Sequence, residues 1–157
     1  MLRVTTKLTE PALATATLCL PFELRQRSRL RARLEDGRDV GLFLMRGSVL
    51  RDGDCLRAED DTVIAVRAAL QRVSTAYAET PLVLARACYH LGNRHVPLQI
   101  GLNWVRYECD HVLDEMVLGL GLAVACELAP FEPESGAYDG VRHVHPVRDW
   151  LRDALRA

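Results

Sequence analysis

All five histidines of this chain lie in its second half, and His111 stands two residues after a cysteine at the start of a predicted helix. Cys109 and His111 form this close pair, and the other histidines are His90, His95, His143 and His145. Neutral imidazole and thiolate are ligands that suit Ni, Cu and Zn ions. Each histidine taken alone is also explained as a surface or core-edge residue. The pattern therefore predicts metal binding only if the fold brings several of these side chains together.

Catalysis has little support in the same sequence. The G-x-S-x-G elbow, the Walker A loop, the Gly-rich dinucleotide turn, the H-E-x-x-H motif and paired-cysteine zinc spacing are all missing from it. Asp114 and Glu115 are adjacent, so on a helix they point about 100° apart and do not form an acid–base pair. We predict that the protein is not an enzyme.

The charge of the chain is unevenly distributed. The formal net charge is −1, but residues 73–140 hold only three Arg against nine Asp or Glu. An acidic surface repels nucleic acid and favours cations or basic protein surfaces. A solvated acidic face explains the same composition. The charge therefore argues against a nucleic-acid partner without identifying the true one.

Cysteine usage and the lack of long apolar runs bear on the compartment. The five cysteines are odd in number and include no C-x-x-C pair, which argues against a disulfide framework and for a reducing environment. No apolar run approaches the ~20 residues of a membrane span. The N-terminus shows no export signal. We expect a cytoplasmic protein with no membrane partner.

Residues 1–70 are predicted to form a small all-β domain. Asp36-Gly37 is a hairpin turn signal, and apolar strands are expected over 39–45 and 62–66. Between residues 25 and 34, arginine alternates with other residues, which places five arginines on one face of a strand. That stripe is either a solvated face or a surface for an acidic partner. RNA is disfavoured because no aromatic residues are interleaved.

Residues 71–140 are predicted to form a ferredoxin-like βαββαβ domain. Thr80 is a helix cap followed by Pro81 at the first helical position, and Asp110 caps a second helix. The strands are expected over 72–78, 96–102, 104–109 and 123–128, with the two helices between the first and second and between the third and fourth. The predicted fold class is therefore α+β, with the all-β domain first.

Residues 141–157 are predicted to be a tail with a short amphipathic helix that Pro146 starts. Its apolar stripe consists of Val147, Trp150, Leu151, Ala154 and Leu155. The stripe either docks on the protein itself or binds a partner.

Four runs of sequence resemble the UreE family of urease accessory proteins. The most specific is ARACYHLGNRHVPLQI over 85–100. CDHVLDEM over 109–116 is similar to the start of that family's second helix, and FEPESGAY over 131–138 is similar to its closing motif. DGRDVGLFL over 36–44 fits its first domain. The runs occur in the family's order and extend over most of the chain.

The resemblance implies a homodimeric nickel metallochaperone that delivers Ni²⁺ to the urease active site. Its partners would be the urease accessory GTPase and the urease apoprotein complex. The β-domain would bind proteins and the ferredoxin-like domain would hold the metal. His95 would bind Ni²⁺ at the dimer interface together with the same residue of the other subunit.

Two departures from the family affect the remaining ligands. Cys109 stands where many members have histidine, so the weaker site that it would form with His111 is expected to be softer, with Zn²⁺ or Cu ions as competitors. The tail keeps only His143 and His145, one of which is expected to complete the nickel shell. The alternative reading is a ferredoxin-like binding or regulatory module with incidental metal binding.

Overall fold

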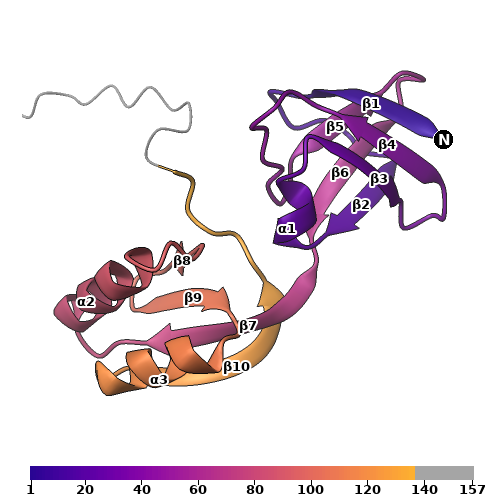
Figure 1. The fold of residues 1–157 in the computed structure, drawn as a ribbon. Coiled ribbons are helices and arrows are strands. Elements are labelled where there is room, and N and C mark those ends of the chain that lie inside the picture. Colours follow the sequence, from indigo (N-terminus) through magenta and orange to yellow (C-terminus); the bar gives the residue numbers. More distant parts are fainter. Residues whose placement is uncertain (137–157) are drawn as a thin grey trace, which may run out of the picture.

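The computed structural model of the chain describes residues 1–136, which form two β-sheets joined by a continuous chain (Figure 1). The N-terminal sheet has six strands in the order β2-β6-β5-β1-β4-β3 and curls toward a barrel. Its elements are β1 (Leu2–Lys7), β2 (Ala16–Leu20), α1 (Phe22–Arg25), β3 (Arg29–Arg33), β4 (Asp39–Phe43), β5 (Cys55–Ala58) and β6 (Val63–Ala68). We call these elements the N-terminal unit.

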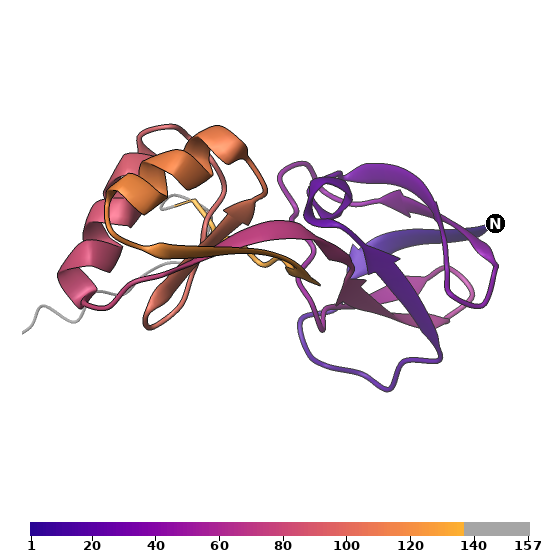
Figure 2. The same ribbon diagram turned by 90° about the horizontal axis from the view of Figure 1, so that it is seen from below.

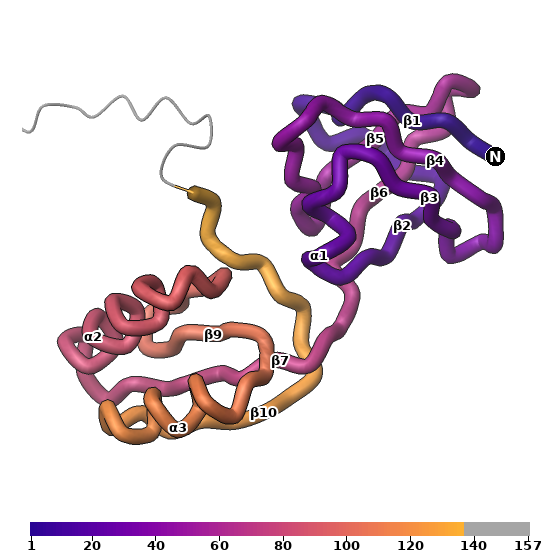
Figure 3. The backbone as a smooth tube through the Cα atoms, in the orientation of Figure 1, coloured from indigo at the N-terminus to yellow at the C-terminus, as the bar shows by residue number. Residues whose placement is uncertain are grey.

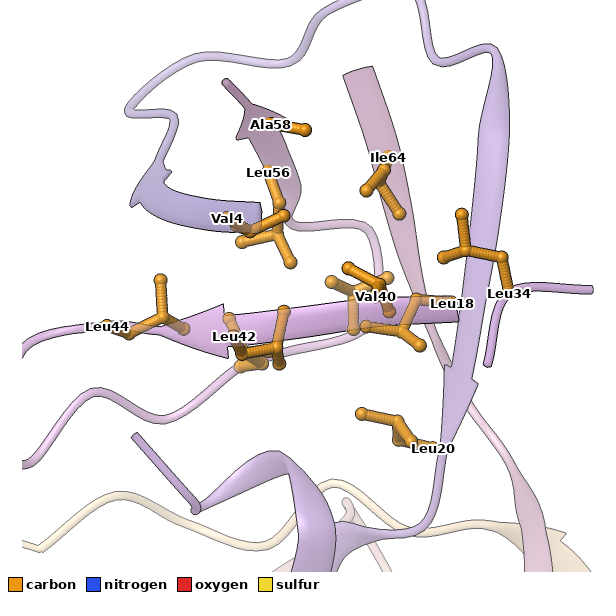
Figure 4. Close-up of a cluster of buried hydrophobic side chains, with 12 residues drawn as sticks. Val4, Leu18, Leu20, Leu34, Val40, Leu42, Leu44, Leu56, Ala58 and Ile64 are labelled. Carbon is orange, nitrogen blue, oxygen red and sulfur yellow. The ribbon is translucent and has the colours of Figure 1, made fainter. Parts of the chain in front are cut away.

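The core of the N-terminal unit is built from aliphatic side chains that meet inside the curled sheet (Figure 4). Val4, Leu18, Val40, Leu42 and Ile64 are completely buried there. They come from four different strands, β1, β2, β4 and β6, so the core extends across most of the sheet. The predicted hairpin between β3 and β4 is confirmed, and Gly37 has the positive φ of 88° that its turn requires.

The C-terminal sheet has four antiparallel strands in the order β10-β7-β9-β8, which is the arrangement of a ferredoxin-like fold. Its elements are β7 (Leu70–Tyr77), α2 (Pro81–Gly92), β8 (Gln99–Ile100), β9 (Trp104–Glu108), α3 (His111–Gly119) and β10 (Ala123–Pro130). We call them the C-terminal unit. Both helices cover the same face of the sheet (Figure 2). The predicted βαββαβ order is confirmed.

Strand alternation divides the C-terminal sheet into a face that packs on the helices and an open face. Ala76, Val105 and Tyr107 belong to the core formed with α2 and α3. Because successive side chains alternate, the even-numbered residues of β7 lie on this helix-covered face. Ser74 and its strand partner Cys126 therefore lie on it as well.

Three expectations from the sequence differ from the structure. The strand expected to begin at Arg25 is confined to β3, and Arg25 itself ends the single helical turn α1 with its side chain fully buried. The strand expected over 96–102 is reduced to Gln99 and Ile100. The cysteine pattern argued against a disulfide framework, and the structure holds one disulfide, between Cys109 and Cys126, beside three free cysteines. The predicted tail helix and its apolar stripe lie outside the described residues.

After β10, residues 131–135 run back between the two units, and we call this segment the strap (Figure 3). Toward the N-terminal unit, Arg25 donates hydrogen bonds to the carbonyl of Phe131 and to the Glu132 carboxylate. Toward the C-terminal unit, Glu134 N–H donates to the carbonyl of Leu98 (2.7 Å). The strap thus contacts both units. No helix among residues 1–136 is long and apolar enough to cross a membrane.

Candidate functional site

His95 lies in the turn that follows α2, with its side chain exposed. The helix ends at Gly92, and Asn93, Arg94 and His95 each donate a backbone hydrogen bond to the helix's last carbonyls. His95 itself has a φ of 58°, in the left-handed region that non-glycine residues seldom occupy. Such a backbone persists only where the surroundings enforce it, which is common at functional positions. The turn therefore fixes the position of the His95 backbone, from which the imidazole projects.

A cleft of about 350 Å³ brings His95 together with residues from both units. Its lining includes Phe22 and Arg51 from the N-terminal unit and Glu134 from the strap. Arg51 Nη2 donates to the hydroxyl of Ser135 (2.9 Å), which holds that end of the strap beside the cleft. The predicted nickel ligand therefore lies where the strap passes between the units.

A second cleft of about 640 Å³ contains the predicted Cys109 and His111 pair. His111 begins α3, whose N-terminus is capped by Asp110: its Oδ1 accepts from Val112 N–H (2.8 Å) and Leu113 N–H (3.1 Å). Both caps predicted from the sequence are confirmed, since Thr80 Oγ1 accepts from the third residue of α2 in the same way. Capping fixes the helix start and so places His111 at the mouth of this cleft.

The same cleft holds Cys126, which the sequence did not single out. Cys126 is in β10 and Cys109 follows β9, and their Cα atoms are 6.6 Å apart. This separation lies in the range that a disulfide spans. Cys126 could have been found by pairing the expected strands, because a central β7 places residues 109 and 126 on the same face.

Acidic groups and one arginine complete the lining of the second cleft. Glu108, Asp110 and Asp114 contribute carboxylates and Arg72 a guanidinium. Tyr107 is buried beneath it and donates its hydroxyl hydrogen to Asp114 Oδ1 (2.8 Å). Burial, and then this hydrogen bond, raise the pKa of Tyr107, so the phenol stays protonated and keeps donating. The contact fixes the Asp114 carboxylate at the edge of the cleft.

The predicted ligands are thus divided between two places. Cys109 and His111 share a cleft, whereas His95 lines another one with no residue in common. Within residues 1–136, no group of three or more His, Cys, Asp or Glu side chains is arranged to hold a metal ion. His143 and His145 lie outside the described residues.

Cys88 is a free thiol that is partly buried beside a carboxylate. It lies on α2 and packs against the core of the C-terminal unit. Burial, together with the nearby Glu134 carboxylate, raises the pKa of the Cys88 thiol. A thiol must lose its proton to bind a metal, so Cys88 is a poor ligand where it stands.

Comparison with known proteins assigns both units to one family. Residues 2–69 match the N-terminal domain of the UreE urease accessory protein and residues 71–152 match its C-terminal domain. The urease accessory protein UreE of Alkalilimnicola ehrlichii is 62% identical over 140 residues, covering 89% of this chain and 86% of that protein. UreE of Proteus mirabilis is 55% identical over 79% of this chain and 77% of its own length. UreE of Pseudomonas putida is 51% identical over 91% and 89%, respectively. The chain therefore belongs to the UreE family of urease accessory proteins, which in general are non-catalytic nickel chaperones for urease maturation.

Proposed function

We propose that this protein acts as a homodimer that carries one Ni²⁺ bound by His95 of each subunit. The observation that supports this most is the exposed His95 imidazole on a left-handed turn at the end of α2. A surface imidazole with a fixed backbone can meet its equivalent across a two-fold axis without rearrangement of either chain. Each chain then supplies one ligand, and the complete pair exists only in the dimer.

A Ni²⁺ coordination shell with only two protein imidazoles suits a protein that must pass the ion to another protein. The remaining positions are filled by water or by exchangeable groups, so a recipient can replace them one at a time. Nickel needs such geometric control, because Cu²⁺ binds more tightly at most nitrogen and oxygen sites and Zn²⁺ also competes. We infer that Ni²⁺ is the cargo and that Zn²⁺ and Cu²⁺ are its competitors.

We propose a division of labour along the chain, with residues 1–70 as a protein-interaction domain, 71–140 as the metal-binding domain and 141–157 as a tail. The partners would be the urease accessory GTPase and the urease apoprotein complex. The exposed arginines of β3 offer one basic surface for them. Arg31 and Arg33 already pair with Asp39 (3.0 and 3.3 Å), which leaves Arg29 as the better anchor on this strand.

We further propose that Cys109 and His111 form a weaker, softer site that is not needed for delivery. Both side chains line the second cleft, where carboxylates add negative charge. A thiolate with an imidazole favours Cu⁺ or Zn²⁺ over Ni²⁺. The cytoplasm is the proposed compartment, because Cys19, Cys55 and Cys88 are free and a single disulfide is not the framework typical of secreted proteins.

The proposal predicts one tightly bound Ni²⁺ per two chains. Equilibrium dialysis against Ni²⁺, combined with light scattering on the same sample, measures stoichiometry and mass together. We expect a dimer with half a nickel ion per chain at saturation of the tight site. A monomer, or a dimer without tight binding, would contradict the proposal and leave a ferredoxin-like binding module as the alternative.

We also propose that a tail histidine, His145 or His143 in its place, completes the nickel shell. The strap ends beside the cleft that His95 lines, and Gly136, which follows the strap, lines the same cleft. Truncation after Tyr138 is expected to weaken nickel binding by at least about tenfold, since the loss of a ligand's hydrogen-bonding partner alone already costs that much. X-ray absorption on both nickel-loaded forms counts the imidazoles. Identical spectra and affinities would exclude the tail as a ligand.

A further inference from the structure

We propose that Cys126 joins Cys109 and His111 in a metal site controlled by oxidation. In the structure the two sulfur atoms are bonded to each other, and residues 1–136 hold no ready three-ligand group. Reduction frees both thiols, and the three side chains then bind one soft cation, Zn²⁺ or Cu⁺. Oxidation links the two cysteines and removes both sulfur ligands. The inference extends the proposed soft site at Cys109 and His111, and it is independent of nickel binding by His95.

The sheet itself brings the two sulfur atoms together. Cys126 is paired with Ser74 of β7, and Cys109 N–H donates to the carbonyl of Arg72 on the same strand (3.4 Å). The two cysteines therefore flank one central strand and project on the same face. Cys126 is held by β-pairing within β10, and Cys109 is held by its backbone hydrogen bond directly after β9, so contacts other than the disulfide support their Cα separation of 6.6 Å.

Each sulfur atom accepts a hydrogen bond from a neighbouring side chain. Ser74 Oγ donates to Cys109 Sγ (3.3 Å), and Arg72 Nη2 donates to Cys126 Sγ (3.7 Å). Donors that face sulfur stabilise a thiolate, which is the form that binds metals and reacts with oxidants. His111 stands on the same cleft and contributes the nitrogen ligand. Two sulfurs and one imidazole are a donor set that zinc sites use, with an open fourth position.

Both cysteines can be reached from solvent. Cys126 is exposed and Cys109 half-buried, on an open cleft of about 640 Å³. A small oxidant or a hydrated cation can therefore reach both sulfur atoms. Among the other cysteines, Cys55 is buried and Cys88 is partly covered, while Cys19 is exposed without a second thiol beside it. Only one pair among the five is bonded.

The redox step balances with a peroxide as oxidant. One thiolate attacks a peroxide oxygen, the O–O bond breaks, and a sulfenic acid and a first water form. The second thiol then displaces the sulfenic oxygen as a second water, and the S–S bond forms. The cysteines lose two electrons and two protons in total, and hydrogen peroxide is reduced to two waters. A bound cation loses both sulfur ligands in this step and is released.

Thiol counting tests the redox half of the proposal. The reduced protein should show all five thiols under denaturing conditions, and the peroxide-treated protein three. The loss should equal two hydrogen atoms in mass, and peptide mapping should find Cys109 linked to Cys126. Cys126→Ser should retain its remaining thiols under the same mild treatment. Five thiols after treatment, or a link between other cysteines, would overturn the proposal.

Zinc titration of the full-length reduced protein tests the metal half. Cys126→Ser should weaken Zn²⁺ binding on the order of tenfold to a hundredfold, and so should oxidation of the wild-type protein. Cys19→Ser is the matched control, because it removes an exposed thiol from the N-terminal unit. Unchanged Zn²⁺ affinity in Cys126→Ser would overturn the proposal. If Cys126→Ser kept its Zn²⁺ affinity but a Cys109→Ala, His111→Ala double variant lost Zn²⁺ binding, the site would consist of Cys109 and His111 alone.

Discussion

Replacing His95 with alanine is expected to abolish tight nickel binding while the dimer stays folded. One substitution removes two imidazoles from the complex, one from each subunit. Loss of hydrogen-bonding partners of a ligand alone costs about tenfold to a hundredfold in metal affinity, so loss of both ligands should exceed a hundredfold. Equilibrium dialysis and light scattering give affinity and mass together.

Two further variants separate ligand loss from backbone effects. His95 has a φ of 58°, a region that costs any residue with a Cβ, histidine and alanine alike, about 1–2 kcal/mol, whereas glycine adopts it freely. His95→Gly should therefore lose nickel while the free energy of unfolding rises, whereas His95→Ala should lose nickel with the backbone cost unchanged. His90→Ala is the matched control, an exposed histidine one turn earlier on α2. Wild-type nickel affinity in both His95 variants would show that the ion is bound elsewhere.

Replacing Arg25 with alanine is expected to destabilise the protein by about 3–5 kcal/mol, the cost of breaking a buried ion pair by removing one partner. Arg25 is completely buried and donates to the carbonyls of Leu20 (3.1 Å) and Leu50 (3.0 Å). It also donates to the carbonyl of Phe131 and pairs with Glu132 on the strap. Its loss takes a donor from the carbonyls of Leu50 and Phe131 and from Glu132, whereas the Leu20 carbonyl still accepts from Ala69 N–H (3.0 Å).

Urea denaturation measures the effect of Arg25→Ala against Arg29→Ala, which removes an exposed arginine nearby. Surface substitutions of that kind usually change the free energy of unfolding by less than about 0.5 kcal/mol. A loss below about 1 kcal/mol for Arg25→Ala would mean that water replaces the guanidinium at the strap. An Arg25→Lys variant should recover little, because one ammonium group cannot reach acceptors on several sides.

The helix starts were predictable because their signals are local. Thr80 and Asp110 each cap a helix through backbone N–H groups two or three residues ahead. The strand order of the C-terminal sheet followed from the order of helices and strands. Such features depend on few residues and no distant partner.

Arg25 was misassigned because its partners are far away in the sequence. Alternation alone placed it on a solvated strand face with Arg27 and the arginines that follow. Its actual partner Glu132 is 107 residues further along the chain. A period of two cannot reveal a buried guanidinium whose acceptors include Phe131 and Glu132 of the distant strap.

The candidate site was predictable in part for the same reason. His95, Cys109 and His111 follow from motifs, whereas the cleft that joins His95 to Arg51 and Glu134 requires the folded arrangement of both units. The pairing of Cys109 with Cys126 depends on strand register, which the residue types alone do not specify.

The strap changes which motions the two units can make. Only Ala69 separates β6 from β7, and a single short link of that kind acts as a swivel. Arg25 and Arg51 add a second attachment through the strap carbonyls of Phe131 and Pro133. Phe22 adds a third attachment, because its N–H donates to Gln71 Oε1 (3.0 Å) and its ring packs with Val73, Ala129 and Phe131. The two units are therefore fastened at several places around the swivel. A partner that moves the N-terminal unit relative to the C-terminal unit must first break contacts of the strap or of this apolar cluster.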